Sequence, residues 1–235
     1  MALDQIPNAA DFNSRRVTNM GSSEIVRQRF YDYQLYPTAG ITQLTFFSAP
    51  VGQGVTSAQG ATVGTSKTLF DTNLELPNTL PSGKAFMIES IEVLFTPGNT
   101  ATGYVPANLS QFAATAAAAL TAQLNDINTI YQSGLLELNI LSKNYLRETP
   151  LLAFPPKAHL DVSAAVATTA TAGTEAAVVF AKAAGRPYYL SPEIALQPAV
   201  NFEVKCTWPG VVATPSGFNG RMGVILDGYF MRAGQ

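Results

Sequence analysis

Apolar segments with the alternation of β-strands recur along this chain, and turns rich in Pro and Gly separate them. The clearest segments cover residues 41–48, 84–96, 135–142, 193–208 and 220–235. Strand-like segments in this series, without the regular interleaving of helices, predict antiparallel β-structure and not βαβ units. Around Pro198 the pattern fits either a pair of strands or one bulged strand.

The segment 84–96 is apolar on both of its faces, which is typical of a strand in the middle of a packed sheet. Uninterrupted alternation places Glu89 and Glu92 on opposite faces. In the second half of 193–208, alternation places Cys206 and Trp208 on the same face as Phe202, and we expect all three in the core.

One segment has the period of a helix instead. Residues 106–134 carry an apolar stripe with spacings of three and four, which predicts an inserted amphipathic helix of about 20–25 residues. Asn108 is expected to cap its first turn, and Gly134 is expected to end it in the left-handed conformation. The stripe consists of Leu109, Phe112, Ala116, Leu120, Leu124, Ile127 and Tyr131.

Two regions have weaker patterns. Residues 157–187 fit two strands or partly helical structure, and we favour a hairpin. Residues 1–36 have few large apolar side chains before Ile25, which fits either disorder or an N-terminal arm that a neighbour orders. We interpret 1–36 as an extended arm and 37–235 as one domain with the helix inserted at about 106–134.

Charged residues make up only 13% of the chain, against about 25% in a typical soluble domain. Residues 37–66, 93–125 and 206–220 contain no charged side chain at all. These stretches fit either Gly/Thr/Ser-rich loops or surfaces that face other protein subunits. The net charge of −2, without a basic excess in residues 1–36, argues against strong nucleic-acid binding, and no window is apolar enough for direct membrane insertion.

The chain has few residues of the types that usually form catalytic or metal-binding sites. Cys206 is the only cysteine, so no intrachain disulfide forms, and His159 is the only imidazole, which excludes zinc sites with two or more histidines. No nucleophile motif accompanies His159, and no phosphate-binding loop is complete. We therefore expect no catalytic site, no cofactor and no metal, and predict that the chain is not an enzyme.

Four segments, in this order, resemble the jelly-roll coat proteins of tailless icosahedral bacterial viruses. They are YDYQLYPTAGITQLTFF, TNLELPNTLPSGKAFMIESIEVLF, IALQPAVNFEVKCTWPG and RMGVILDGYFMRAG. The resemblance implies an all-β antiparallel jelly-roll sandwich of about eight strands. It also implies a major capsid protein that is made in the host cytoplasm, forms trimers or pseudo-hexamers and closes into the shell of the virion, with copies of itself and minor capsid proteins as partners.

Within this hypothesis we expect subunit contacts from Phe12, Arg15 and Arg16 in the arm, with Tyr33 and Tyr36 as aromatic anchors. The alternative function is a carbohydrate-binding or fibre-type jelly-roll module, which would need exposed aromatic side chains on one face or a calcium site. A hydrolase on the same fold is a further rival, and it would have to use His159.

Overall fold

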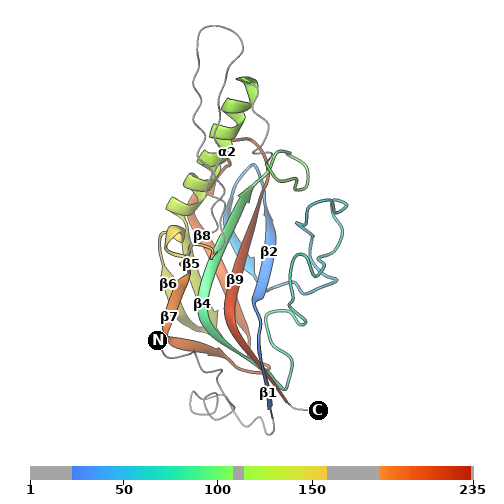
Figure 1. The fold of residues 1–235 in the computed structure, drawn as a ribbon, viewed down its shortest axis with the longest axis vertical. Coiled ribbons are helices and arrows are strands. Elements are labelled where there is room, and N and C mark those ends of the chain that lie inside the picture. Colours follow the sequence, from blue (N-terminus) through green and yellow to red (C-terminus); the bar gives the residue numbers. More distant parts are fainter. Residues whose placement is uncertain (1–22, 108–113, 158–185, 234–235) are drawn as a thin grey trace.

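The computed structural model describes residues 23–107, 114–157 and 186–233 (Figure 1). Strands dominate this part of the chain, with one long helix between the fourth and fifth strands. In chain order the elements are β1 (Ser23–Arg27), β2 (Phe30–Tyr36), β3 (Ile41–Phe46), β4 (Lys84–Pro97), α2 (Ala114–Ser133), β5 (Leu135–Ile140), β6 (Lys143–Glu148), the 3-10 helix η1 (Leu151–Ala153), β7 (Tyr188–Leu196), β8 (Phe202–Val212) and β9 (Gly220–Ala233).

The strands form two antiparallel sheets that pack face to face. One sheet has the order β1-β9-β4-β7, with β2 also paired to β9, and the other has the order β3-β8-β5-β6. The chain changes sheet at six of the eight connections between successive strands, which is consistent with the predicted jelly roll. The all-β antiparallel sandwich with one inserted helix is therefore confirmed, and Figure 1 shows the two layers with α2 rising from one end.

Strand β9 lies inside its sheet. It pairs with β4 along one edge and with β1 and β2 along the other, so its backbone groups have partners on both sides. Side chains from both sheets fill the space between them and bury a large aromatic cluster. The largest fully buried aromatic members are Phe30, Tyr36, Phe46, Phe47, Phe86, Phe154 and Phe202.

A β-bulge in β4 changes which residues face the core. Ile88 pairs with Gly228 while Ser90 pairs with Asp227, so Glu89 is the extra residue. Phe86 faces the core before the bulge and Ile91 faces it afterwards. Uninterrupted alternation was therefore the wrong prediction for this strand, because one inserted residue reverses the faces beyond it.

Helix α2 confirms the predicted insertion for residues 114–133, and its last turns pack on the sandwich. The hydroxyl of Tyr131 donates to the carbonyl of Val93 (2.8 Å) and accepts from the backbone N–H of Phe95 (2.9 Å). Gly134 does not have the predicted left-handed φ. A glycine stands there because a Cβ would lie 2.3 Å from Cδ1 of Leu151 in η1.

The prediction that the N-terminal arm extends to residue 36 is wrong for residues 23–36. These residues form β1 and β2, and Phe30 and Tyr36 are core residues with 1% and 0% exposure. The strand pattern of β2 is obscured because polar Asp32 and Gln34 occupy the positions between them on the same face. Residues 1–22, and nearly all of the predicted hairpin at 157–187, lie outside the described residues, as does the predicted cap Asn108.

Three of the five edge strands, β2, β6 and β7, carry features that hinder the addition of further strands. Residues 71–73 run along the free edge of β2, with Asp32 bridged to Thr72. Tyr145 has no partner on β5 and forms a bulge in the edge strand β6, and Pro192 removes a backbone donor from the edge strand β7. Bulges, prolines and covered edges all disfavour pairing with another chain.

We predict that Gly228→Ala destabilises the protein by about 2–4 kcal/mol, because its Cβ would lie 1.8 Å from the carbonyl oxygen of Met87 opposite the bulge. Urea denaturation measures this loss. Gly210→Ala is the matched control, since a Cβ there meets nothing within 4 Å, and its stability should stay within about 0.5 kcal/mol of wild type. Equal stabilities of the two variants would contradict the close approach of Gly228 to the backbone of Met87.

Candidate interaction surface

A 37-residue connection, residues 47–83, joins β3 to β4 and lies beside β2 (Figure 1). We call it the β3–β4 loop. It contains three charged residues, Lys67, Asp71 and Glu75. Lys67 and Asp71 are buried, with 4% and 0% exposure, so two of the three charges point inward. Connections of this length are usually functional when they are ordered.

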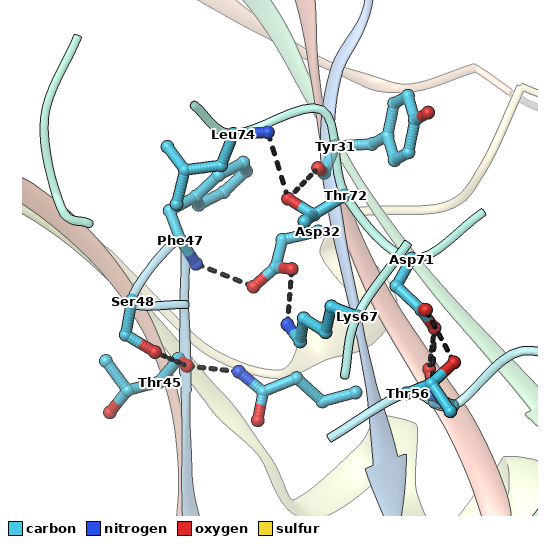
Figure 2. Close-up of polar contacts among 12 residues, drawn as sticks. Tyr31, Asp32, Thr45, Phe47, Ser48, Thr56, Lys67, Asp71, Thr72 and Leu74 are labelled. Atoms are coloured by element: carbon cyan, nitrogen blue, oxygen red, sulfur yellow. Dashed lines mark hydrogen bonds and ion pairs between the residues drawn. The ribbon is translucent and has the colours of Figure 1, made fainter. Parts of the chain in front are cut away.

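The first anchor of this loop is a buried ion pair. Lys67 Nζ donates to Oδ1 of Asp32 at 2.5 Å, and the backbone N–H of Phe47 donates to Oδ2 at 2.7 Å (Figure 2). Asp32 projects from the face of β2 that also carries Phe30 and Tyr36. Burial raises the pKa of the Asp32 carboxyl above its usual value, and the Lys67 ammonium opposes that rise.

The second anchor is the carboxylate of Asp71, which gathers the loop around itself (Figure 2). The Thr56 hydroxyl donates to Oδ2 at 2.6 Å, and the backbone N–H and hydroxyl of Ser57 donate to Oδ1 at 2.8 and 3.0 Å. Burial alone would raise the pKa of Asp71. The hydrogen bonds from Thr56, Thr68 and Ser57 outweigh burial, and the pKa lies below its usual value.

Arg221 of β9 fastens the loop to the sheet from the outside. Its Nη2 donates to the carbonyl of Phe70 at 2.6 Å, its Nε donates to the hydroxyl of Ser57 at 3.1 Å, and Nη2 lies 3.5 Å from Oδ1 of Asp71. The same guanidinium covers the ring of Tyr33, 4.2 Å from its centroid. The backbone at Phe70 is therefore held in place by a strand that is central to the sheet.

The outward side of the loop carries six exposed large apolar side chains, interspersed with exposed Gly, Gln, Thr and Ser residues. Phe70 is 79% exposed, the largest value among the exposed large hydrophobic side chains of the described residues. Surface loops usually expose their charged residues and bury their apolar ones. This loop buries Lys67 and Asp71 and exposes Leu69 and Phe70. We take the neighbouring Leu69 and Phe70 as the centre of a candidate interaction surface, because exposed apolar patches on a folded chain mark interaction sites. The exposed apolar residues of the loop are Val51, Val55, Val63, Leu69, Phe70 and Leu76.

The five residues predicted at subunit contacts have different outcomes in the structure. Tyr36 is wrong as an interface anchor, because it is fully buried and its hydroxyl donates to the carbonyl of Val212 at 2.5 Å. Tyr33 is half-buried beneath Arg221, and its role at an interface stays a prediction. The other three predicted contacts, Phe12, Arg15 and Arg16, lie outside the described residues, and so does His159.

The predicted core positions of β8 are confirmed. Cys206 is fully buried, and burial raises the pKa of its thiol. Trp208 is 3% exposed, and its Nε1 donates to the carbonyl of Ile130 at 3.2 Å. Trp208 is therefore a packing residue between the sandwich and α2, and it offers no accessible ring to a ligand.

A second group of charges lies on the outer side of the β1–β9–β4 sheet. Arg27 contacts Glu89 (3.1 Å) and Asp227 (3.4 Å). The backbone N–H of Lys157 donates to Glu92 at 2.8 Å, and the Lys157 ammonium pairs with Asp227. The bulge at Glu89 brings three carboxylates into one group, contrary to the separation that alternation predicted. Each carboxylate has a basic partner, so the group ties β1 and the segment at residue 157 to the sheet. Its members are Arg27, Arg29, Glu89, Glu92, Lys157 and Asp227.

The sequence did not predict the residues that anchor the β3–β4 loop, which are Asp32, Lys67, Asp71 and Arg221. A signal for Lys67 was present, because it is the first charge after thirty uncharged residues, 37–66. A lone charge in such a setting favours a specific partner over simple solvation. The partner itself could not be found, since Asp32 precedes the uncharged stretch and only the fold brings the two together.

Comparison with protein-family models, curated proteins and solved structures finds no match to this chain. Among the described residues, no group of three or more His, Cys, Asp or Glu side chains is arranged to hold a metal ion. No helix in the described ranges has the length and hydropathy to cross a membrane.

We predict that Lys67→Met lowers the free energy of unfolding by about 3–5 kcal/mol, because it leaves the Asp32 carboxylate buried without its counter-charge. Urea denaturation measures the loss, and limited proteolysis should show faster cleavage within residues 47–83. Lys84→Met is the matched control. It removes a partly exposed pair with Glu75 and should change stability by less than about 1 kcal/mol. A small effect of both variants would refute the anchoring role.

The depressed pKa of Asp71 predicts a dependence of stability on acid. A carboxylate with a lowered folded-state pKa stabilises the fold above its unfolded pKa of 3.8, and this contribution is lost as the pH falls through the folded pKa. Wild type should therefore lose stability from about pH 4 to pH 2 more steeply than Asp71→Asn. Chemical denaturation at a series of pH values tests this, and parallel curves would contradict it.

Proposed function

We propose that this chain is a structural subunit of a viral capsid that associates with copies of itself through the apolar side of the β3–β4 loop. The observation that carries the proposal is the reversed polarity of that loop, with Lys67 and Asp71 buried and Phe70 and Leu69 exposed. Burying one such side chain at a contact is worth about 1.5–3 kcal/mol. In a closed shell many such contacts sum to a stable assembly.

The low charge of the chain supports the same proposal. Surfaces with few charges lose little solvation when they meet, so modest apolar contacts are sufficient for association. The blunted margins at β2, β6 and β7 disfavour association by strand pairing. These features favour loop surfaces over the edges of β2, β6 and β7 as contact regions. In this proposal the protein is made in the host cytoplasm, acts in the virion without catalysis, and has minor capsid proteins as further partners.

The alternative, a carbohydrate-binding or fibre-type module, has less support. Such a module needs accessible aromatic rings gathered on one face. Trp208 is buried, and the exposed aromatic side chains of the described residues, Phe70, Tyr145 and Tyr189, belong to the β3–β4 loop, β6 and β7 respectively.

We predict that the purified protein forms trimers, tubes or shells, as measured by size exclusion with light scattering and by negative-stain electron microscopy. Phe70→Ser combined with Leu69→Ser should shift the population to monomer, because both side chains are more than half exposed before association. The monomeric double variant should keep the secondary structure of wild type, as measured by circular dichroism, since neither side chain belongs to the core.

Leu141→Ser is the control for this experiment. Leu141 is 68% exposed, close to the 66% of Leu69, but it lies in the turn between β5 and β6. Its substitution should leave assembly as in wild type. A wild-type chain that stays monomeric at high concentration, or a Phe70/Leu69 variant that assembles normally, would refute the proposed contact.

A further inference from the structure

A cavity of about 450 Å³ opens where the β3–β4 loop meets the end of the β1–β9–β4 sheet. Its apolar walls include Leu74 from the loop and Phe230 from β9, together with Val51 and Leu69. Leu74 and Phe230 belong to the core, so the cavity reaches the margin of the packed core. The volume lies within the range of about 300–1,000 Å³ that is usual for small-molecule sites.

One rim of the cavity is cationic. Arg232 lies two residues after Phe230 on β9, so both side chains project from the core face of the strand. Lys84 is its register partner on β4 and pairs with Glu75 from the loop. Lys84 and Glu75 neutralise each other, so Arg232 leaves the residues that line the cavity with one net positive charge. Glu24, the register partner of Arg232 on β1, is exposed and does not belong to that lining.

The Nε of Arg232 is buried and has no hydrogen-bond acceptor among the described residues. A buried N–H without an acceptor is unfavourable, and native structures normally supply a partner, a water molecule or a ligand. Nε and one Nη of a guanidinium form a planar pair of donors that matches the two oxygens of a carboxylate. The unsatisfied donor therefore defines the chemistry that would complete this site.

We propose that the cavity binds a small carboxylate that carries an apolar chain, with the carboxylate on Arg232 and the chain on Leu74, Phe230 and Val51. This proposal does not rest on the capsid role, although Val51 and Leu69 belong both to the cavity walls and to the exposed side of the β3–β4 loop. An alcohol with the same apolar chain lacks the negative charge, and a short carboxylate lacks the apolar chain. Each should therefore bind more weakly than a carboxylate that carries the chain.

The test is calorimetric titration of the full-length protein with octanoate, octan-1-ol, acetate and octylammonium. Octanoate should bind saturably, and each of the other probes at least about tenfold more weakly. Arg232→Gln should weaken octanoate by about tenfold or more. Arg232→Lys keeps a charge but loses the paired donors, so it should also weaken binding, and it decides the question if Arg232→Gln fails to fold.

Two controls separate this site from other surfaces. Arg147→Gln alters an exposed arginine that pairs with Glu137 on β5, and it should leave octanoate binding unchanged. Phe70→Ser should also leave it unchanged, whereas a loss there would assign the binding to the exposed loop and overturn the proposal. Octan-1-ol binding as tightly as octanoate, no saturable octanoate binding, or wild-type affinity in Arg232→Lys would overturn it equally.

Discussion

The buried pair of Asp32 and Lys67 is the interaction on which the two proposed binding surfaces of this protein depend. Removing two opposite charges from water is expensive, and their attraction compensates only where the geometry is good and the remaining acceptors are satisfied. Both oxygens of Asp32 are satisfied here, one by Lys67 and the other by the N–H of Phe47. The pair fixes one position for a 37-residue connection that has little regular secondary structure of its own.

That one loop forms two different surfaces. Its outward side presents Phe70 and its neighbours, and its other margin supplies Leu74 and Glu75 to the cavity beside Arg232. The loop also covers the free edge of β2 through residues 71–73. Anchoring by Asp32, by the hydrogen bonds of Asp71 and by Arg221 therefore controls the shape of an exposed face, a cavity wall and a sheet margin together.

The parts of the fold that were predictable from the sequence are those with a strong apolar pattern. Strands β5 and β8 were predicted correctly because apolar and polar residues alternate along them, strands β3, β4 and β9 because they are rich in β-favouring apolar residues, and the helical stripe located α2. Strand β2 was missed because polar Asp32 occupies a core-facing position. Strand β6, KNYLRE, is an exposed edge strand with almost no apolar face to detect.

The candidate sites were harder to predict because they depend on partners that are distant in sequence. The bulge at Glu89 is visible only once Gly228 is placed opposite β4. Local patterns reveal burial, but they carry no information on which strands become neighbours. The same limit applies to Arg232, whose unsatisfied donor follows from the surroundings of its side chain and not from any motif.

The features that hinder strand pairing at β2, β6 and β7 have a consequence for how copies of this chain can associate. Strand-to-strand addition has no natural end point, because each added chain offers a fresh edge to the next, and the product is a fibre. With β2 covered, β6 bulged and β7 interrupted by Pro192, that open-ended route is disfavoured. Copies that meet through rigid side-chain surfaces instead hold fixed angles to one another, and fixed angles allow a finite object to close upon itself.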